Sequence, residues 1–172
     1  MKTQSLLVNG ALHAAIAGAD SFPALARIAI KHHLEVHGGI IHFASGPVST
    51  GGAGNKEENL HRLAHASRKL TEMYGFVMFD HPIWEDRIKV LAARWEAKPG
   101  NSGYCWPIMK DFYRRLFNQK ALKVQGLWLL PEWGTSTGAR DEKEVCVKNN
   151  IPINYLAPSI FSDLPPLPTV NV

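Results

Sequence analysis

A glutamate that follows a turn rich in Gly, Ser and Thr is the residue of this chain best suited to chemistry. Glu142 lies in the first two turns of a helix expected after Pro131, and an apolar strand at 124–130 comes just before that proline. Gly134 and Gly138 let the backbone approach a ligand closely, and Ser or Thr at the helix start leaves N–H groups pointing outward. Such an opening suits a phosphate or a sugar hydroxyl. A carboxylate there can attack or stabilise an oxocarbenium-like sugar centre.

The position of Glu142 is compatible with two interpretations. In the first, the positive end of the helix dipole lowers the pKa of Glu142 and keeps it as a reactive anion. In the second, Glu142 belongs to an ordinary solvated face of the helix, because charged residues surround it at positions 140, 141, 143 and 144. Spacing alone does not separate a catalytic carboxylate from such a face.

A second loop of small residues follows the first strand. The apolar run 39–44 predicts a short buried strand, and Asn55 with Glu58 forms a capping-box pattern that starts the next helix. A Gly/Ser loop between strand and helix can cradle a phosphate or sugar, although this one matches neither the Walker pattern nor a dinucleotide fingerprint. A plain flexible connection is the alternative. The loop residues expected to contact a ligand are Ser45, Gly46, Pro47, Ser49, Thr50 and Gly51.

Three segments together resemble the nucleoside 2-deoxyribosyltransferase superfamily, including the 2'-deoxynucleoside 5'-monophosphate N-glycosidases and their uncharacterised phage and bacterial relatives. Residues 43–47 read Phe-Ala-Ser-Gly-Pro, and residues 75–82 read Gly-Phe-Val-Met-Phe-Asp-His-Pro. The third and most specific segment is Leu-Pro-x-Trp at 130–133 followed by Ser-x-Gly-Ala-x-x-Glu at 136–142. The segments stand in the order of the family, and the resemblance covers about residues 39–156.

The resemblance implies a role for each matching residue. Glu142 would attack the anomeric carbon, expel the base and form a glycosyl-enzyme that water or another base resolves. Ser136, Gly138 and the first loop would hold sugar hydroxyls or a 5'-phosphate. Asp80 and Glu132, each next to a strand end, are candidates for a proton-handling partner.

Two positions depart from the family pattern. Relatives often carry an Asp where this chain has Gln125, and a glutamine can hydrogen-bond a hydroxyl but cannot exchange a proton. Monophosphate-cleaving relatives place an Arg in the first loop, where Ser49 and Thr50 stand here. Trp133 offers an aromatic face for a base. A nucleotide-binding module without turnover is therefore an alternative, and Gln125 is its main support.

Two further alternatives belong to other classes. The Gly-Thr turn followed by a glutamate is also similar to the phosphoribohydrolases that release cytokinin-like bases, which usually carry a Pro-Gly-Gly turn that residues 131–133 lack. The other alternative is a nucleic-acid-binding protein, because basic residues gather around one predicted helix, although a solvated helix face is the commoner reason for such a group. These residues are Lys110, Arg114, Arg115, Lys120 and Lys123.

The order of elements predicts an α/β fold. Apolar strands near 39–45, 75–79, 124–130 and 151–155 alternate with helices, which implies right-handed crossovers and a parallel sheet. With the resemblance, this indicates a flavodoxin-like (Rossmann-like) sheet with helices on both faces and a site at the carboxyl ends of its strands. We expect one domain, 1–172, with a helical extension at 1–38, a core at 39–156 and an extended proline-rich tail at 157–172. In the extension, Ser21 before Phe22 and Pro23 is expected to start a helix, and Gly38 is expected to end it.

Composition supports a small intracellular enzyme. The chain is 172 residues long and 45% hydrophobic, enough for one substantial core, and its net charge of +4 slightly favours anionic small molecules. Cys105 and Cys146 lack the spacing of a secreted disulfide scaffold, and no stretch is apolar enough to span a bilayer. We expect a cytoplasmic protein that binds a nucleoside or nucleotide, contacts no membrane and forms a homo-oligomer, with a tail that crosses onto a neighbouring subunit or stays mobile.

No metal site and no cofactor are expected. His61 and His65 stand at i and i+4, a spacing that can hold a metal, but no third ligand is specified nearby in the sequence. Glu57 and Glu58 are better explained as residues of a helix's first turn.

Overall fold

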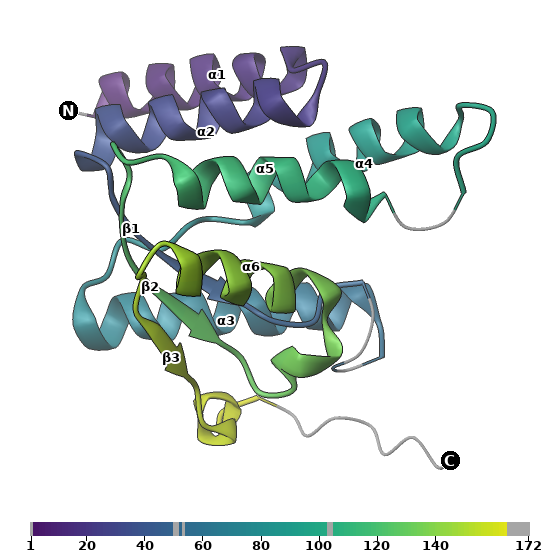
Figure 1. Cartoon of the computed structure of the whole chain (residues 1–172). Coiled ribbons are helices and arrows are strands. Elements are labelled where there is room, and N and C mark those ends of the chain that lie inside the picture. The colour runs from purple at the N-terminus through teal and green to yellow at the C-terminus, as the bar shows by residue number, and fades with distance from the viewer. Residues whose placement is uncertain (1, 50–51, 53, 103–104, 165–172) are drawn as a thin grey trace. The chain divides into compact units, whose positions relative to one another are not determined.

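The computed structural model describes residues 2–49, 52, 54–102 and 105–164 (Figure 1). The chain divides into two compact units, one running to Gly39 and continuing over His81–Leu122, the other comprising Ile40–Asp80 and the chain from Lys123. All the regular elements described in the first unit are helices, and residues 81–122 of the expected core group with the N-terminal helices. In chain order the elements are α1 (Lys2–Gly18), α2 (Phe22–His37), β1 (Ile40–Ser45), α3 (Lys56–Tyr74), α4 (Pro82–Glu96), α5 (Trp106–Asn118), β2 (Lys123–Leu129), η1 (Trp133–Thr135), α6 (Thr137–Lys148), β3 (Ile153–Tyr155) and η2 (Pro158–Phe161).

The helical unit shows how local sequence sets element ends. Ser21 caps α2, since its Oγ accepts a hydrogen bond from the N–H of Ala24 at 3.3 Å, and Gly38 ends the helix with a left-handed φ of 60°. Both boundaries confirm the sequence-based prediction. Trp84 of α4 and Phe112 of α5 are both fully buried, with ring centroids 6.2 Å apart, and supply much of the unit's core.

The second unit contains a three-stranded parallel sheet in the order β1-β2-β3. Ser45 at the end of β1 is level with Leu129 of β2, which is level with Tyr155 of β3. The carboxyl ends of the three strands therefore meet at one edge of the sheet. The predicted α/β class and the parallel sheet are confirmed.

The strand predicted at 75–79 is reduced to one isolated parallel bridge between Met78 and His42. The N–H of His42 donates a hydrogen bond to the carbonyl of Val77, and the carbonyl of His42 accepts one from the N–H of Phe79, each at 2.8 Å. Gly75 caps α3 just before this segment and α4 begins at Pro82 just after it, so little chain is left for a ladder. The bridge lies on the side of β1 that faces away from β2.

The two faces of the sheet carry different helices. Side chains alternate along a strand, so Ala44 and Ser45 of β1 point to opposite faces. Ala44 packs with Leu63 and Ala66 of α3 in one buried cluster, whereas Ser45 contacts α6 through Glu142. The sheet consequently lies between α3 and α6, as Figure 1 shows.

The tail is not extended where it leaves the sheet. Residues expected to form an extended arm from 157 include η2, whose Ile160 and Phe161 pack against the cluster between β1 and α3. Apolar side chains between the prolines allow this short helix to pack against the cluster and become partly buried. None of the helices in the described part of the chain is long and apolar enough to cross a membrane.

Candidate functional site

Ser45 and Glu142 form a buried pair at the carboxyl end of β1. The Oγ of Ser45 donates a hydrogen bond to Oε2 of Glu142, and the two side chains belong to residues that are only 4% and 6% exposed. The pairing joins the loop after β1 to α6, so the structure brings two of the sequence-predicted site residues into direct contact.

The pKa of Glu142 is raised to about 8, mainly because burial disfavours the charged carboxylate. The hydrogen bond from Ser45 lowers this pKa, but less than burial raises it. The nearby charge of Asp141 raises the pKa further. The prediction that the helix start lowers the pKa of Glu142 is therefore wrong. Glu142 is the sixth residue of α6, beyond the first turn in which the helix dipole is strongest.

Ser136 has a structural role at the start of α6. Its Oγ accepts a hydrogen bond from the N–H of Ala139 at 3.2 Å, and the residue is 7% exposed. A hydroxyl that accepts one bond can still donate another. Gly138 lies in the first turn of the same helix and is half-buried.

The first loop is held in place by close packing. Gly46 and Pro47 are buried, and a Cβ on Gly46 would lie 2.8 Å from Cβ of Leu130. The buried Asn59 of α3 donates from Nδ2 to the carbonyl of Val48 at 3.1 Å. Ser49 is exposed, and the predicted contacts at Thr50 and Gly51 lie outside the described residues.

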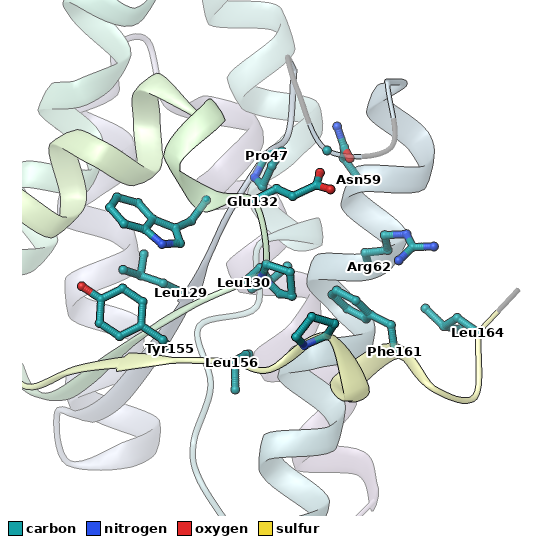
Figure 2. Close-up of a pocket in the computed structure, with 14 residues that line it drawn as sticks. Pro47, Asn59, Arg62, Leu129, Leu130, Glu132, Tyr155, Leu156, Phe161 and Leu164 are labelled. Carbon is teal, nitrogen blue, oxygen red and sulfur yellow. The ribbon is translucent and has the colours of Figure 1, made fainter. Parts of the chain in front are cut away.

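A cavity of about 640 Å³ opens beside this loop at the carboxyl edge of the sheet (Figure 2). Pro47, Glu132 and Trp133, three of the residues predicted from sequence, line it. Ser45 and Glu142 are not among its lining residues. The cavity and the buried carboxylate are thus neighbouring features built from the same loops, and the carboxylate does not form the cavity wall.

Several residues that line the cavity were not predicted. Asn59 and Arg62 lie one helical turn apart on α3, and Figure 2 shows both on one side of the cavity with Tyr155 on the other. Phe161 and Leu164 complete the wall from the C-terminal end. The i, i+3 spacing of Asn59 and Arg62 places them on one helix face, but the sequence does not show that this face reaches a ligand site.

The backbone at Glu132 is unusual. Its φ of 63° lies in the left-handed region, which costs a non-glycine residue free energy and occurs often at functional sites. The carbonyl of Glu132 accepts bonds from the N–H and the hydroxyl of Thr135, at 2.9 and 2.8 Å. These bonds hold the backbone of Glu132, an exposed residue that lines the cavity.

Trp133 and Tyr155 form an aromatic pair beside Glu132, with ring centroids 5.9 Å apart. The ammonium group of Lys143 on α6 lies 4.4 Å from the centroid of Trp133 and 5.6 Å from that of Tyr155. A cation over these rings stabilises them as a rigid surface and places a positive charge near one end of the cavity.

Two predicted residues lie away from the cavity. Gln125 is exposed in an irregularity of the β1–β2 register, and its Nε2 donates to the carbonyl of Lys123 at 3.3 Å. Leu129, which lines the cavity, stands four positions further along β2, about 13 Å from Gln125. Asp80 is exposed just after Phe79, whose ring stacks on Phe43 of β1.

His61 and His65, the pair with the spacing of metal ligands, contact different side chains. Nδ1 of His61 lies 3.8 Å from Oε2 of Glu58. Nδ1 of the buried His65 contacts Arg68 at 3.0 Å, and its Nε2 lies 3.1 Å from Oδ1 of Asp163. In the part of the chain that the structure describes, no three His, Cys, Asp or Glu side chains gather as metal ligands do.

Comparisons of this chain with models of known protein families, with functionally characterised proteins and with solved structures find no match.

Proposed function

We propose that this protein cleaves or transfers the N-glycosidic bond of a nucleoside or a nucleoside 5'-monophosphate, with Glu142 as the nucleophile. The observation that carries the proposal is the buried contact between Ser45 and Glu142. These two residues belong to the two loops whose motifs resemble the nucleoside 2-deoxyribosyltransferase superfamily. Their contact is what a shared site requires.

The order of the strands supports a flavodoxin-like fold. With the Met78 bridge counted as an edge, the order across the sheet is the segment at 78, then β1, β2 and β3. Numbered along the chain, this is the 2-1-3-4 order of doubly wound sheets. In such a sheet the strand order reverses between the first and third segments, which are β1 and β2 here. Ligands bind outside the carboxyl ends of the strands at that reversal. Ser45 and the segment after Leu129 flank it here.

The proposed reaction uses Glu142 and one proton-handling group. The Glu142 carboxylate forms an ester bond to the anomeric carbon while the bond to the base breaks, and the leaving base takes the bonding electrons and a proton. Water or a second base then displaces the carboxylate. Glu132 lines the cavity and Asp80 does not, so the geometry favours Glu132 as the proton-handling group.

The raised pKa sets a condition on this reaction. With a pKa of about 8, Glu142 carries its proton in most molecules at pH 7, and only the ionised form can attack. The hydrogen bond from Ser45 stabilises that ionised form and orients the carboxylate. Activity is therefore expected to increase toward alkaline pH.

A nucleotide-binding module without turnover is the second candidate. The observation that favours it is that Glu142 does not line the cavity, so a ligand could occupy the cavity without touching the carboxylate. A cytoplasmic location and a homo-oligomer remain parts of the proposal for either candidate.

One screen separates the two candidates. The protein is incubated at pH 8.5 with a panel of nucleosides and 5'-monophosphates, with and without an acceptor base, while free base is followed by chromatography and unfolding by thermal shift. Release of base from one substrate supports the enzyme and identifies hydrolysis or transfer. Stabilisation without release from any substrate contradicts the enzyme and supports the binding module.

A further inference from the structure

The segment at 156–164, called the C-terminal wall below, forms one side of the cavity. Leu156, Pro158, Phe161 and Leu164 line the cavity from this segment, and Figure 2 shows three of them, Leu156, Phe161 and Leu164, along a single stretch of chain. All four side chains are apolar. The wall thus offers a surface suited to the flat, weakly polar face of a ligand, such as a nucleobase.

Backbone bonds attach this wall to the sheet at one end. The N–H of Leu156 donates to the carbonyl of Leu129 at 2.8 Å, next to the last paired residue of β3. Further along the wall, the described backbone bonds join Ile160 to Ala157, Ser162 to Ser159 and Leu164 to Phe161. These three bonds are local turns, which shape the segment but do not hold it against the rest of the protein.

Asp163 supplies an attachment to α3 near the far end of the wall. Its carboxylate lies 2.8 Å from Nζ of Lys69 and 3.1 Å from Nε2 of His65. The side chain of Arg68 lies 3.0 Å from Nδ1 of His65 and helps to hold that ring in place. Asp163 accordingly forms an ion pair with Lys69 and lies against the ring of His65, two side chains of one helix.

Phe161 is fixed on the same helix face. The guanidinium of Arg62 lies 5.0 Å from the centroid of its ring, and the ring of His65 lies 6.2 Å away. Arg62, His65 and Lys69 follow one another at i, i+3 and i+7, so they form one stripe along α3. The wall lies along this stripe, with Phe161 near Arg62 and Asp163 between His65 and Lys69.

We propose that Asp163 is a positioning residue for the cavity. Its ion pair with Lys69 and its contact with His65 hold the C-terminal wall on α3, so that Phe161 and Leu164 stay in contact with a bound ligand. Asp163 does not line the cavity and acts only through these neighbours. The proposal rests on the proposed function for the identity of the ligand, whereas the attachment itself can be tested without one.

Hydrogen exchange of the full chain without ligand tests the attachment. We expect Asp163→Asn to increase exchange of the amides at 160–164 by tenfold or more, because the local turns open once the anchor is lost. Glu144→Gln is the matched control, since it breaks an exposed ion pair with Lys148 on α6, and neither residue belongs to the wall or lines the cavity. Unchanged exchange in Asp163→Asn, or an equal increase in the control, would overturn the proposal.

Steady-state kinetics with the substrate found in the screen tests the positioning. We expect Asp163→Asn to raise KM by threefold to tenfold while kcat stays within twofold of the wild type. Asp163→Glu keeps the negative charge and should have a KM close to that of the wild type. The double variant Asp163→Lys with Lys69→Asp reverses the ion pair and should have a KM between those of Asp163→Asn and the wild type. Faster exchange with an unchanged KM would show that the wall does not hold the ligand. If no substrate is cleaved, the proposed function fails, and the exchange experiment alone decides the role of Asp163.

Discussion

The hydroxyl of Ser45 donates a hydrogen bond to the carboxylate of Glu142, although 97 residues separate them in the chain. The bond connects the end of β1 with α6 inside the protein, where a carboxylate is costly to ionise. A buried acidic residue with no positive partner among the described residues contributes little to stability. Its position at this edge of the sheet supports the proposal that Glu142 takes part in chemistry.

Burial of Glu142 predicts a pH-dependent stability. The folded protein binds this proton more tightly than the unfolded chain, whose glutamate has a pKa near 4.5. The contribution of Glu142 to the free energy of unfolding should decrease as pH rises from about 4.5 to about 8, by on the order of a few kcal/mol, and level off above that range. Glu142→Gln should remove most of this slope.

Urea unfolding at pH 5, 7 and 8.5 measures the effect. Glu144→Gln is the control, because Glu144 is exposed on the same helix and should leave the slope unchanged. An equal pH dependence of stability in the wild type and in Glu142→Gln between pH 5 and 8.5 would contradict the raised pKa.

The same pKa predicts the pH profile of base release. If ionised Glu142 is the nucleophile, kcat/KM should increase about tenfold per pH unit below pH 8 and become constant above it. A profile that decreases through this range would instead identify Glu142 as a proton donor. Initial rates between pH 6 and 9.5 distinguish the two profiles.

Gly46 is predicted to tolerate no side chain. A Cβ there would lie 2.8 Å from Cβ of Leu130, and both residues are buried. Gly46→Ala should lower the free energy of unfolding by about 1–3 kcal/mol, since the two loops must move apart. Gly134→Ala is the matched control, because no atom lies within 4 Å of its added Cβ. Equal urea midpoints for the two variants would refute the close packing.

Glu132 is predicted to be strained by its backbone. At a φ of 63°, glycine is favoured, so Glu132→Gly should be at least as stable as the wild type. Glu132→Val should lose about 1–2 kcal/mol, because a β-branched residue is disfavoured in this region. Thermal unfolding of both variants checks the order. A glycine variant less stable than the valine variant would show that the conformation is not strained.

The sequence predicted elements best where the signals are local. Ser21 and Gly38 mark the two ends of α2, and Asn55 caps α3 through a 2.8 Å bond from the N–H of Glu58 to its Oδ1. The strand at 75–79 was overestimated, since its apolar residues pack well but only one residue pairs with β1. Strand pairing depends on partners that a single segment does not contain.

The site was predicted only in part for a similar reason. Motifs pointed to both loops, and the contact between Ser45 and Glu142 agrees with them. Arg62 and Phe161 reach the cavity because α3 and η2 pack together, and no spacing in the sequence encodes that packing. The pKa of Glu142 was predicted in the wrong direction because it depends on the burial of its side chain, which the helix position does not reveal.

Base release by the wild type and by Glu142→Gln tests the central claim most directly. Both proteins, with Glu144→Gln as control, are incubated at pH 8.5 with the substrate identified by the screen. The account predicts that wild type and Glu144→Gln release free base at similar rates and that Glu142→Gln loses at least a thousandfold in rate while remaining folded. Release by Glu142→Gln at the wild-type rate would contradict the assignment of Glu142 as the nucleophile.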